Sequence, residues 1–164
     1  MKPNKIELAM KLMDKIVEAA LFVIVMVMLI AGAMQIFSRY VLNSSLSWSE
    51  ELMRFLYVWM TLIGTSLAVR RKQFTTIEAV YNKVCEKSAV GGKVLMIIAV
   101  VLQIGFFLVL SIYGTQLAQK NMLQASPAMG LSMGIAYLAL PIGGYLGILY
   151  CLFELYDRFK KGGK

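Results

Sequence analysis

Four long apolar segments occupy most of the 164-residue chain and constrain its fold more than any other feature. They lie near residues 16–38, 52–69, 94–118 and 132–153. A helix needs about 20 apolar residues to cross the roughly 30 Å hydrocarbon core of a bilayer. Because backbone N–H and C=O groups in lipid must bond within their own segment, each segment is predicted to be helical. We therefore predict an all-α integral membrane protein, with residues 1–164 forming a single membrane domain of four transmembrane helices.

The distribution of positive charge predicts the orientation of these helices. The net charge is +8, and the basic residues gather in the N-terminal arm, the connection between the second and third segments, and the C-terminal tail. The other two connections contain only Arg39 and Lys120. Cytoplasmic connections of membrane proteins carry an excess of Lys and Arg, so both termini are predicted to be cytoplasmic. The basic excess reflects orientation, and we expect no nucleic-acid partner.

The first segment raises two further questions. Ala31-Gly32-Ala33 resembles the cleavage site of a signal peptide, but the apolar run continues to Phe37, so we expect this segment to remain as a span. Residues 5–18 have an apolar face with charges opposite, which predicts an amphipathic helix. It either lies along the inner membrane surface or extends the first span into the cytoplasm.

The connections contain several local signals. Ser47 or Ser49 is expected to cap the second span, and Pro141 predicts a kink in the fourth span. The third signal is a short helix predicted at the cytoplasmic membrane interface after Thr75, because an apolar stripe follows a capping-box spacing. That stripe consists of Ile77, Val80, Tyr81 and Val84.

The residue types in the chain argue against most kinds of catalytic, metal-binding and ion-binding site. The chain has no histidine, and the cores of the four segments have no Asp, Glu or Lys. A carrier that binds an ion by itself normally keeps an ionisable group at mid-depth in the membrane. Cys85 and Cys151 match no metal or redox motif and are interpreted as packing residues. We predict that the chain is not an enzyme and binds no cofactor or metal.

Charged residues instead gather at the membrane edge between the first and second segments. Glu50 and Arg54 have the i,i+4 spacing of a helical ion pair. This group is either a local structural pair or a docking surface for a partner, and the two interpretations are compatible. The candidate docking residues are Arg39, Asn43, Trp48, Glu50, Glu51 and Arg54.

Small residues spaced four apart predict close helix packing. The candidate packing residues, with the proline of the fourth span, are Gly64, Ala68, Gly130, Gly134, Pro141, Gly143 and Gly147.

Several of these residues form a pattern that resembles a known family. The first half contains Arg39-Tyr40-Val41-Leu42-Asn43, Leu46, a Trp-x-Glu-Glu-x-x-Arg string from Trp48 to Arg54, Trp59, Gly64, Ala68 and Arg70. The second half contains Ser126-Pro127-Ala128, Tyr137 and Pro141-Ile142-Gly143. In this order the residues resemble the small membrane subunit of tripartite ATP-independent periplasmic (TRAP) transporters. Family members often carry a histidine after the second span, where this chain has Gln73-Phe74-Thr75.

The resemblance implies a function. A small subunit of this kind pairs, in the bacterial inner membrane, with a large membrane subunit that holds the substrate and sodium sites. A periplasmic binding protein delivers an organic acid, such as a dicarboxylate or a sialic acid. The small subunit enlarges the scaffold against which the transport domain of the large subunit moves. By this resemblance the chain anchors the complex and helps to dock the binding protein.

Two other functions are compatible with the residues. The chain could be an autonomous small multidrug-type exporter, acting as a homo-oligomer with Glu50 or Glu51 as its proton site. It could also be a membrane-anchored assembly factor with no role in transport.

Overall fold

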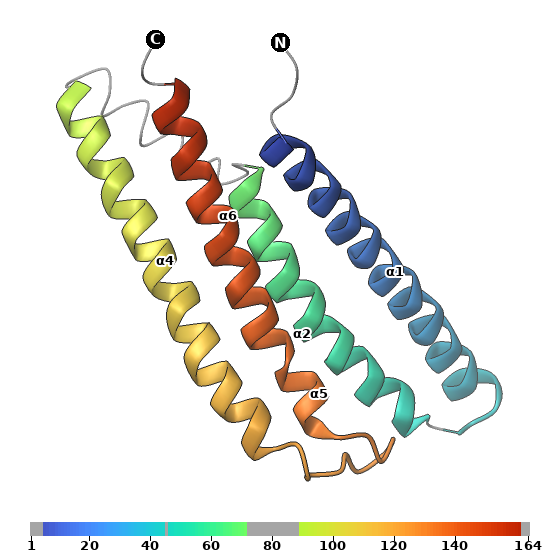
Figure 1. Ribbon diagram of the computed structural model, residues 1–164. Coiled ribbons are helices and arrows are strands. Elements are labelled where there is room, and N and C mark those ends of the chain that lie inside the picture. The colour runs from blue at the N-terminus through green and yellow to red at the C-terminus, as the bar shows by residue number, and fades with distance from the viewer. Residues whose placement is uncertain (1–4, 45, 72–88, 162–164) are drawn as a thin grey trace.

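The computed structural model describes residues 5–44, 46–71 and 89–161. Within these residues the chain forms helices and no strand: α1 (Lys5–Val41), α2 (Ser47–Arg70), α4 (Ala89–Lys120), α5 (Met133–Tyr137) and α6 (Ala139–Lys161) (Figure 1). Four spans in the described residues are long and apolar enough to cross a membrane: Glu7–Val41, Ser47–Arg70, Ile97–Lys120 and Met133–Tyr156. The predicted helical class and the four spans are therefore confirmed. The predicted interfacial helix, with Ile77, Val80, Tyr81 and Val84, lies outside the described residues.

The long helices stand side by side in the order α4, α6, α2, α1 (Figure 1). Among the described helices, the backbone of α1 packs beside α2 alone, and α4 packs beside α6 and the short α5. The end of α1, the start of α2 and the 121–132 loop lie at one end of this row, which we call the loop end. The start of α1 and the end of α6 lie at the opposite end, which we call the termini end.

Helix α1 settles the question that the sequence left open about residues 5–18. It continues without a break for 37 residues, which corresponds to about 55 Å at 1.5 Å per residue. Residues 5–18 therefore extend the first span beyond the membrane core and do not form a separate surface helix. Met10 and Val17 are buried in this extension and pack in one apolar cluster with Tyr150 and Phe153 of α6.

Glycines allow α6 to approach its neighbours closely. A Cβ atom added at Gly143 would lie 2.9 Å from the Cβ of Leu62 in α2, and one at Gly147 would lie 2.4 Å from the ring of Phe107 in α4. Such distances leave no room for a side chain. Gly64 differs, because a Cβ atom there would meet nothing within 4 Å. The packing within this chain thus uses the α6 glycines and leaves the half-buried Gly64 open.

The fourth span is interrupted at Leu138, between α5 and α6, which agrees with the kink predicted near Pro141. Pro141 has no N–H, so the carbonyl of Tyr137 cannot receive the usual helical hydrogen bond. Trp59 of α2 donates its indole N–H to the carbonyl of Ile135 at 3.2 Å. The hydroxyl of Ser66 donates to the carbonyl of Gly143 at 2.7 Å. Polar side chains of α2 therefore bind the backbone on both sides of this interruption.

Candidate functional site

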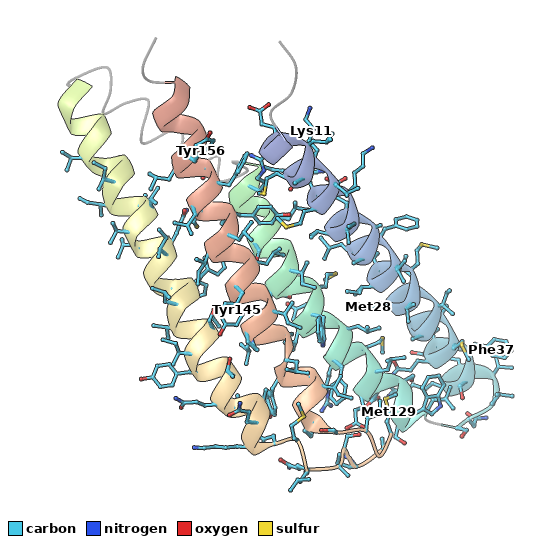
Figure 2. The ribbon with its side chains drawn as sticks, viewed as in Figure 1. Lys11, Met28, Phe37, Met129, Tyr145 and Tyr156 are labelled. Carbon is cyan, nitrogen blue, oxygen red and sulfur yellow. The ribbon has the colours of Figure 1, made fainter. Side chains whose placement is uncertain are left out.

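Apolar side chains cover much of the surface of the helix row (Figure 2). Along α1, the exposed large side chains include Phe22, Ile30 and Phe37, and along α4 they include Leu102, Phe106 and Val109. A monomeric soluble protein rarely exposes so much contiguous apolar surface. These faces are suited to lipid or to another membrane subunit.

The predicted docking residues lie together at the loop end, in the last turn of α1, the following turn and the first two turns of α2. Arg39, Asn43, Trp48, Glu50 and Arg54 are exposed. The sixth, Glu51, is half-buried. We call these six residues the loop-end cluster.

Glu51 is engaged within the chain. Its Oε2 atom accepts hydrogen bonds from the backbone N–H groups of Ala128, at 3.0 Å, and Met129, at 2.9 Å. Figure 2 places Met129 beside the start of α2. Glu51 therefore tethers the 121–132 loop to α2, which gives a physical reason for Glu51 and Ser126-Pro127-Ala128 to belong to one motif.

Gly130 belongs to the same loop and forms part of its turn. Its φ angle is +66°, a conformation that side-chain-bearing residues rarely adopt. Its N–H donates to the carbonyl of Ser126 at 3.1 Å, and a Cβ atom there would meet nothing within 4 Å. Gly130 therefore has a conformational role in this turn, and its role in helix packing stays a prediction. Gly134 does lie at a close contact, because its Cβ atom would be 2.7 Å from the Sδ of Met122.

Glu50 makes a different contact from the one predicted. Its Oε1 atom accepts a hydrogen bond from the Nε2 of Gln35 in α1, at 2.9 Å. The expected ion pair between Glu50 and Arg54 does not form in the described residues, where the carboxylate of Glu50 contacts Gln35 of α1 instead. The side chains of Glu50 and Arg54 border a cleft of about 420 Å³ between α1 and α2. The cleft is lined by Met28, Gln35, Glu50, Met53, Arg54 and Tyr57.

Asn43 forms the turn that ends α1. Its φ angle is +49°, in the left-handed region that Asn tolerates better than most residues. The hydroxyl of Ser38 donates to the carbonyl of Ser44 at 2.8 Å and closes this turn. The predicted capping of α2 by Ser47 or Ser49 is wrong, because the N-cap residue is Leu46 and Ser49 donates to its carbonyl at 2.8 Å.

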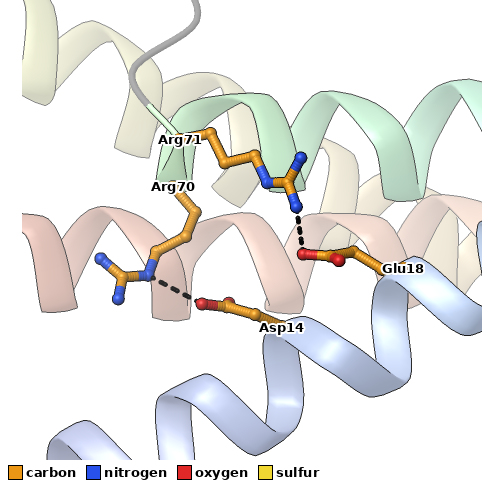
Figure 3. A network of polar contacts seen from close by, with 4 residues as sticks. All are labelled: Asp14, Glu18, Arg70 and Arg71. Atoms are coloured by element: carbon orange, nitrogen blue, oxygen red, sulfur yellow. Dashed lines mark hydrogen bonds and ion pairs between the residues drawn. The ribbon is translucent and has the colours of Figure 1, made fainter.

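A second polar cluster, at the termini end, was missed by the sequence reasoning (Figure 3). Asp14 of α1 lies 3.5 Å from the Nε of Arg70, and Glu18 forms an ion pair with Arg71. The guanidinium of Arg70 also lies over the ring of Phe153, 4.5 Å from its centroid. The spacing of the two acids, four residues apart on α1, is the signal that could have predicted partners for the two arginines that end α2. This cluster joins α1, α2 and α6.

Neither cluster resembles a catalytic centre. Among the residues that the structure describes, no group of three or more Asp, Glu, His or Cys side chains could hold a metal ion. Cys151 is buried, and its thiol points toward the Oε1 of Gln103 at 3.9 Å. The arrangement offers packing faces along the helices and hydrogen-bonding surface at the loop end.

Comparison with known proteins gives a consistent result. The family model described as "Tripartite ATP-independent periplasmic transporters, DctQ component" matches residues 28–161. The sialic acid TRAP transporter small permease protein SiaQ of Vibrio cholerae is 29% identical over 156 residues, which cover 95% of this chain and 88% of that protein. A putative TRAP transporter small permease protein of Haemophilus influenzae is 28% identical over 134 residues, 81% of each chain.

One relative is much longer than this chain. The sialic acid TRAP transporter permease protein SiaT of Haemophilus influenzae is 40% identical over 81 residues. The match covers 48% of this chain and 13% of that protein. A segment similar to this chain therefore occurs within a larger permease polypeptide.

Proposed function

Because the chain belongs to the family of DctQ components of tripartite ATP-independent periplasmic transporters, we propose that it is the non-catalytic scaffold subunit of a sodium-coupled importer of organic acids. As a member of this family it is a transporter component and not an enzyme. In this proposal it lies in the bacterial inner membrane with both termini in the cytoplasm, beside a large permease subunit.

The observation that carries the scaffold role is the open helix row. Helices α1 and α4 stand at the two ends of the row and expose large apolar side chains along their lengths. In the described part of the chain, α1 carries no charged side chain between Glu18 and Arg39, so its middle offers no charged ligand for an ion. These exposed faces support the proposal that the chain lies against a larger membrane protein. Gly64 and Ala68 are candidate contacts for it, since Gly64 has open space around it.

The relatives support the choice of partner and substrate class. SiaT contains a segment similar to this chain within a longer permease, which is the arrangement expected if small and large subunits work side by side. The names of SiaQ and SiaT refer to sialic acid. We therefore favour an organic acid of the sialic acid type, with a dicarboxylate as the second candidate. The family membership favours this function over a small multidrug-type exporter or an assembly factor.

The loop-end cluster is the proposed landing site for the periplasmic binding protein. With cytoplasmic termini the loop end faces the periplasm, where Arg39, Trp48 and Glu50 are exposed. Glu51 acts indirectly, because it holds the 121–132 loop that borders this surface.

The docking proposal is tested with Glu50→Lys in the reconstituted complex. We expect slower uptake of the organic acid at limiting binding protein and recovery at excess binding protein, because the variant weakens encounter and leaves transport intact. Lys11→Glu, an exposed reversal at the termini end, is the matched control and should have no such effect. If Glu50→Lys instead separates the two membrane subunits, the residue is structural and the docking role is wrong.

A further inference from the structure

The cleft between α1 and α2 combines two residues of the loop-end cluster, Glu50 and Arg54, with apolar side chains that the docking role does not explain. Along the two helices, Met28 and Tyr57 lie furthest from the loop end, Met53 lies at the level of Arg54, and Gln35 and Glu50 lie nearest to the loop end. We propose that this cleft binds one phospholipid with an ethanolamine headgroup. One acyl chain of the lipid enters the part of the cleft that lies furthest from the loop end. This inference does not depend on the docking role of the loop-end cluster.

The order of the two charges matches the order of charges in such a lipid. Glu50 precedes Arg54 by one helical turn, about 6 Å along the axis, and α2 begins at the loop end. Glu50 therefore lies nearer the membrane surface, and Arg54 lies deeper. In an ethanolamine phospholipid the phosphate is bonded to the glycerol, and the ammonium extends outward from it. The ammonium then meets a carboxylate, and the phosphate meets a guanidinium.

The chemistry of each contact is suitable. A guanidinium forms strong, geometrically specific hydrogen bonds with phosphate oxygens, and the Arg54 side chain is exposed at the cleft. A carboxylate has about four acceptor positions, so Glu50 can accept from an ammonium while it holds the Nε2 of Gln35. The flexible Met28 and Met53 side chains adapt readily to an acyl chain.

A helix of the large subunit is the other conceivable occupant of the cleft. An apolar helix packed there would remove the exposed guanidinium of Arg54 from water and would supply no acceptor for its N–H groups, which is unfavourable. A phospholipid supplies such acceptors from its phosphate. The charges of the cleft therefore favour the lipid.

The first experiment measures lipid retention by native mass spectrometry. The complex of this chain with its large subunit is exchanged into mixtures of dioleoyl phosphatidylethanolamine and dioleoyl phosphatidylglycerol, without the binding protein. We expect Arg54→Gln to weaken retention of phosphatidylethanolamine about tenfold, because charge-assisted hydrogen bonds to the phosphate are lost. Arg39→Gln, which removes an exposed arginine outside the cleft, is the matched control and should retain the lipid. Equal retention by both variants would overturn the proposal.

Two further variants keep the test independent of any single substitution. Glu50→Gln should shift the preference toward phosphatidylglycerol, because the partner of the ammonium is lost while Arg54 remains. An unchanged preference would contradict the assignment of the headgroup. A photoreactive residue at the half-exposed position of Tyr57 should form adducts with lipid. Adducts with the large subunit alone would show that a protein helix fills the cleft, and would overturn the proposal.

Discussion

The tether between Glu51 and the 121–132 loop makes a quantitative prediction for Glu51→Ala. The substitution removes the acceptor of two backbone N–H groups, those of Ala128 at 3.0 Å and Met129 at 2.9 Å. Hydrogen bonds to a charged group contribute about 1.5–3 kcal/mol when water is excluded. Because Glu51 is half-exposed and water competes for these bonds, we take about 1 kcal/mol for each, or about 2 kcal/mol for the pair. Opening of the loop should then become roughly 30 times more frequent.

Amide hydrogen exchange across residues 121–132 measures this effect. Exchange at Ala128 and Met129 should accelerate strongly in Glu51→Ala and less in Glu51→Gln, whose amide oxygen can still accept. Glu50→Ala is the matched control, since the carboxylate of Glu50 accepts from Gln35 of α1, whereas the loop N–H groups of Ala128 and Met129 donate to Glu51. Exchange that is unchanged in Glu51→Ala, or equally accelerated in Glu50→Ala, would refute the tether.

Three other predictions follow from the packing and the charges. Gly147→Ala places a Cβ atom 2.4 Å from an aromatic ring of α4, so thermal unfolding should show a loss of about 1–3 kcal/mol. Gly105→Ala, with nothing within 4 Å, should be neutral. Asp14→Asn leaves Arg70 without its ion-pair partner. Thermal unfolding should show a loss of stability of about 1 kcal/mol or less, and the loss should be smaller at high salt. Leu123→Cys, at a fully exposed loop position, is made in a chain whose two native cysteines are replaced. It should react with an impermeant thiol reagent added outside intact cells, and protection there would contradict cytoplasmic termini.

The sequence was sufficient to predict the four spans, because the need to satisfy backbone groups in lipid leaves a long apolar segment no alternative to a helix. The interruption before Pro141 could be predicted for a similar reason, since the missing N–H is a property of that residue alone. The continuous extension of α1 could not be decided, because its buried side depends on contacts with α6, which lies more than 100 residues further along the chain.

The loop-end cluster was only partly predictable. Its residues are neighbours in sequence, so their common location followed from the ends of two helices. Their partners did not: Gln35 reaches Glu50 from another helix, and the N–H groups bound by Glu51 come 77 and 78 residues later. The i,i+4 spacing of Glu50 and Arg54 stabilises an ion pair by only about 0.2–0.5 kcal/mol, so contacts from another helix decide where the side chains lie. Asn43 was assigned to docking, although its positive φ gives it a role in the turn after α1.

The central claim is that this chain is a scaffold that transports nothing alone, and uptake into liposomes tests it most directly. Vesicles are prepared with this chain alone, with the large subunit alone, and with both, each with the binding protein and an inward sodium gradient. We expect sodium-driven uptake of the organic acid only where both membrane subunits are present. Robust uptake by vesicles that contain this chain alone would contradict the account.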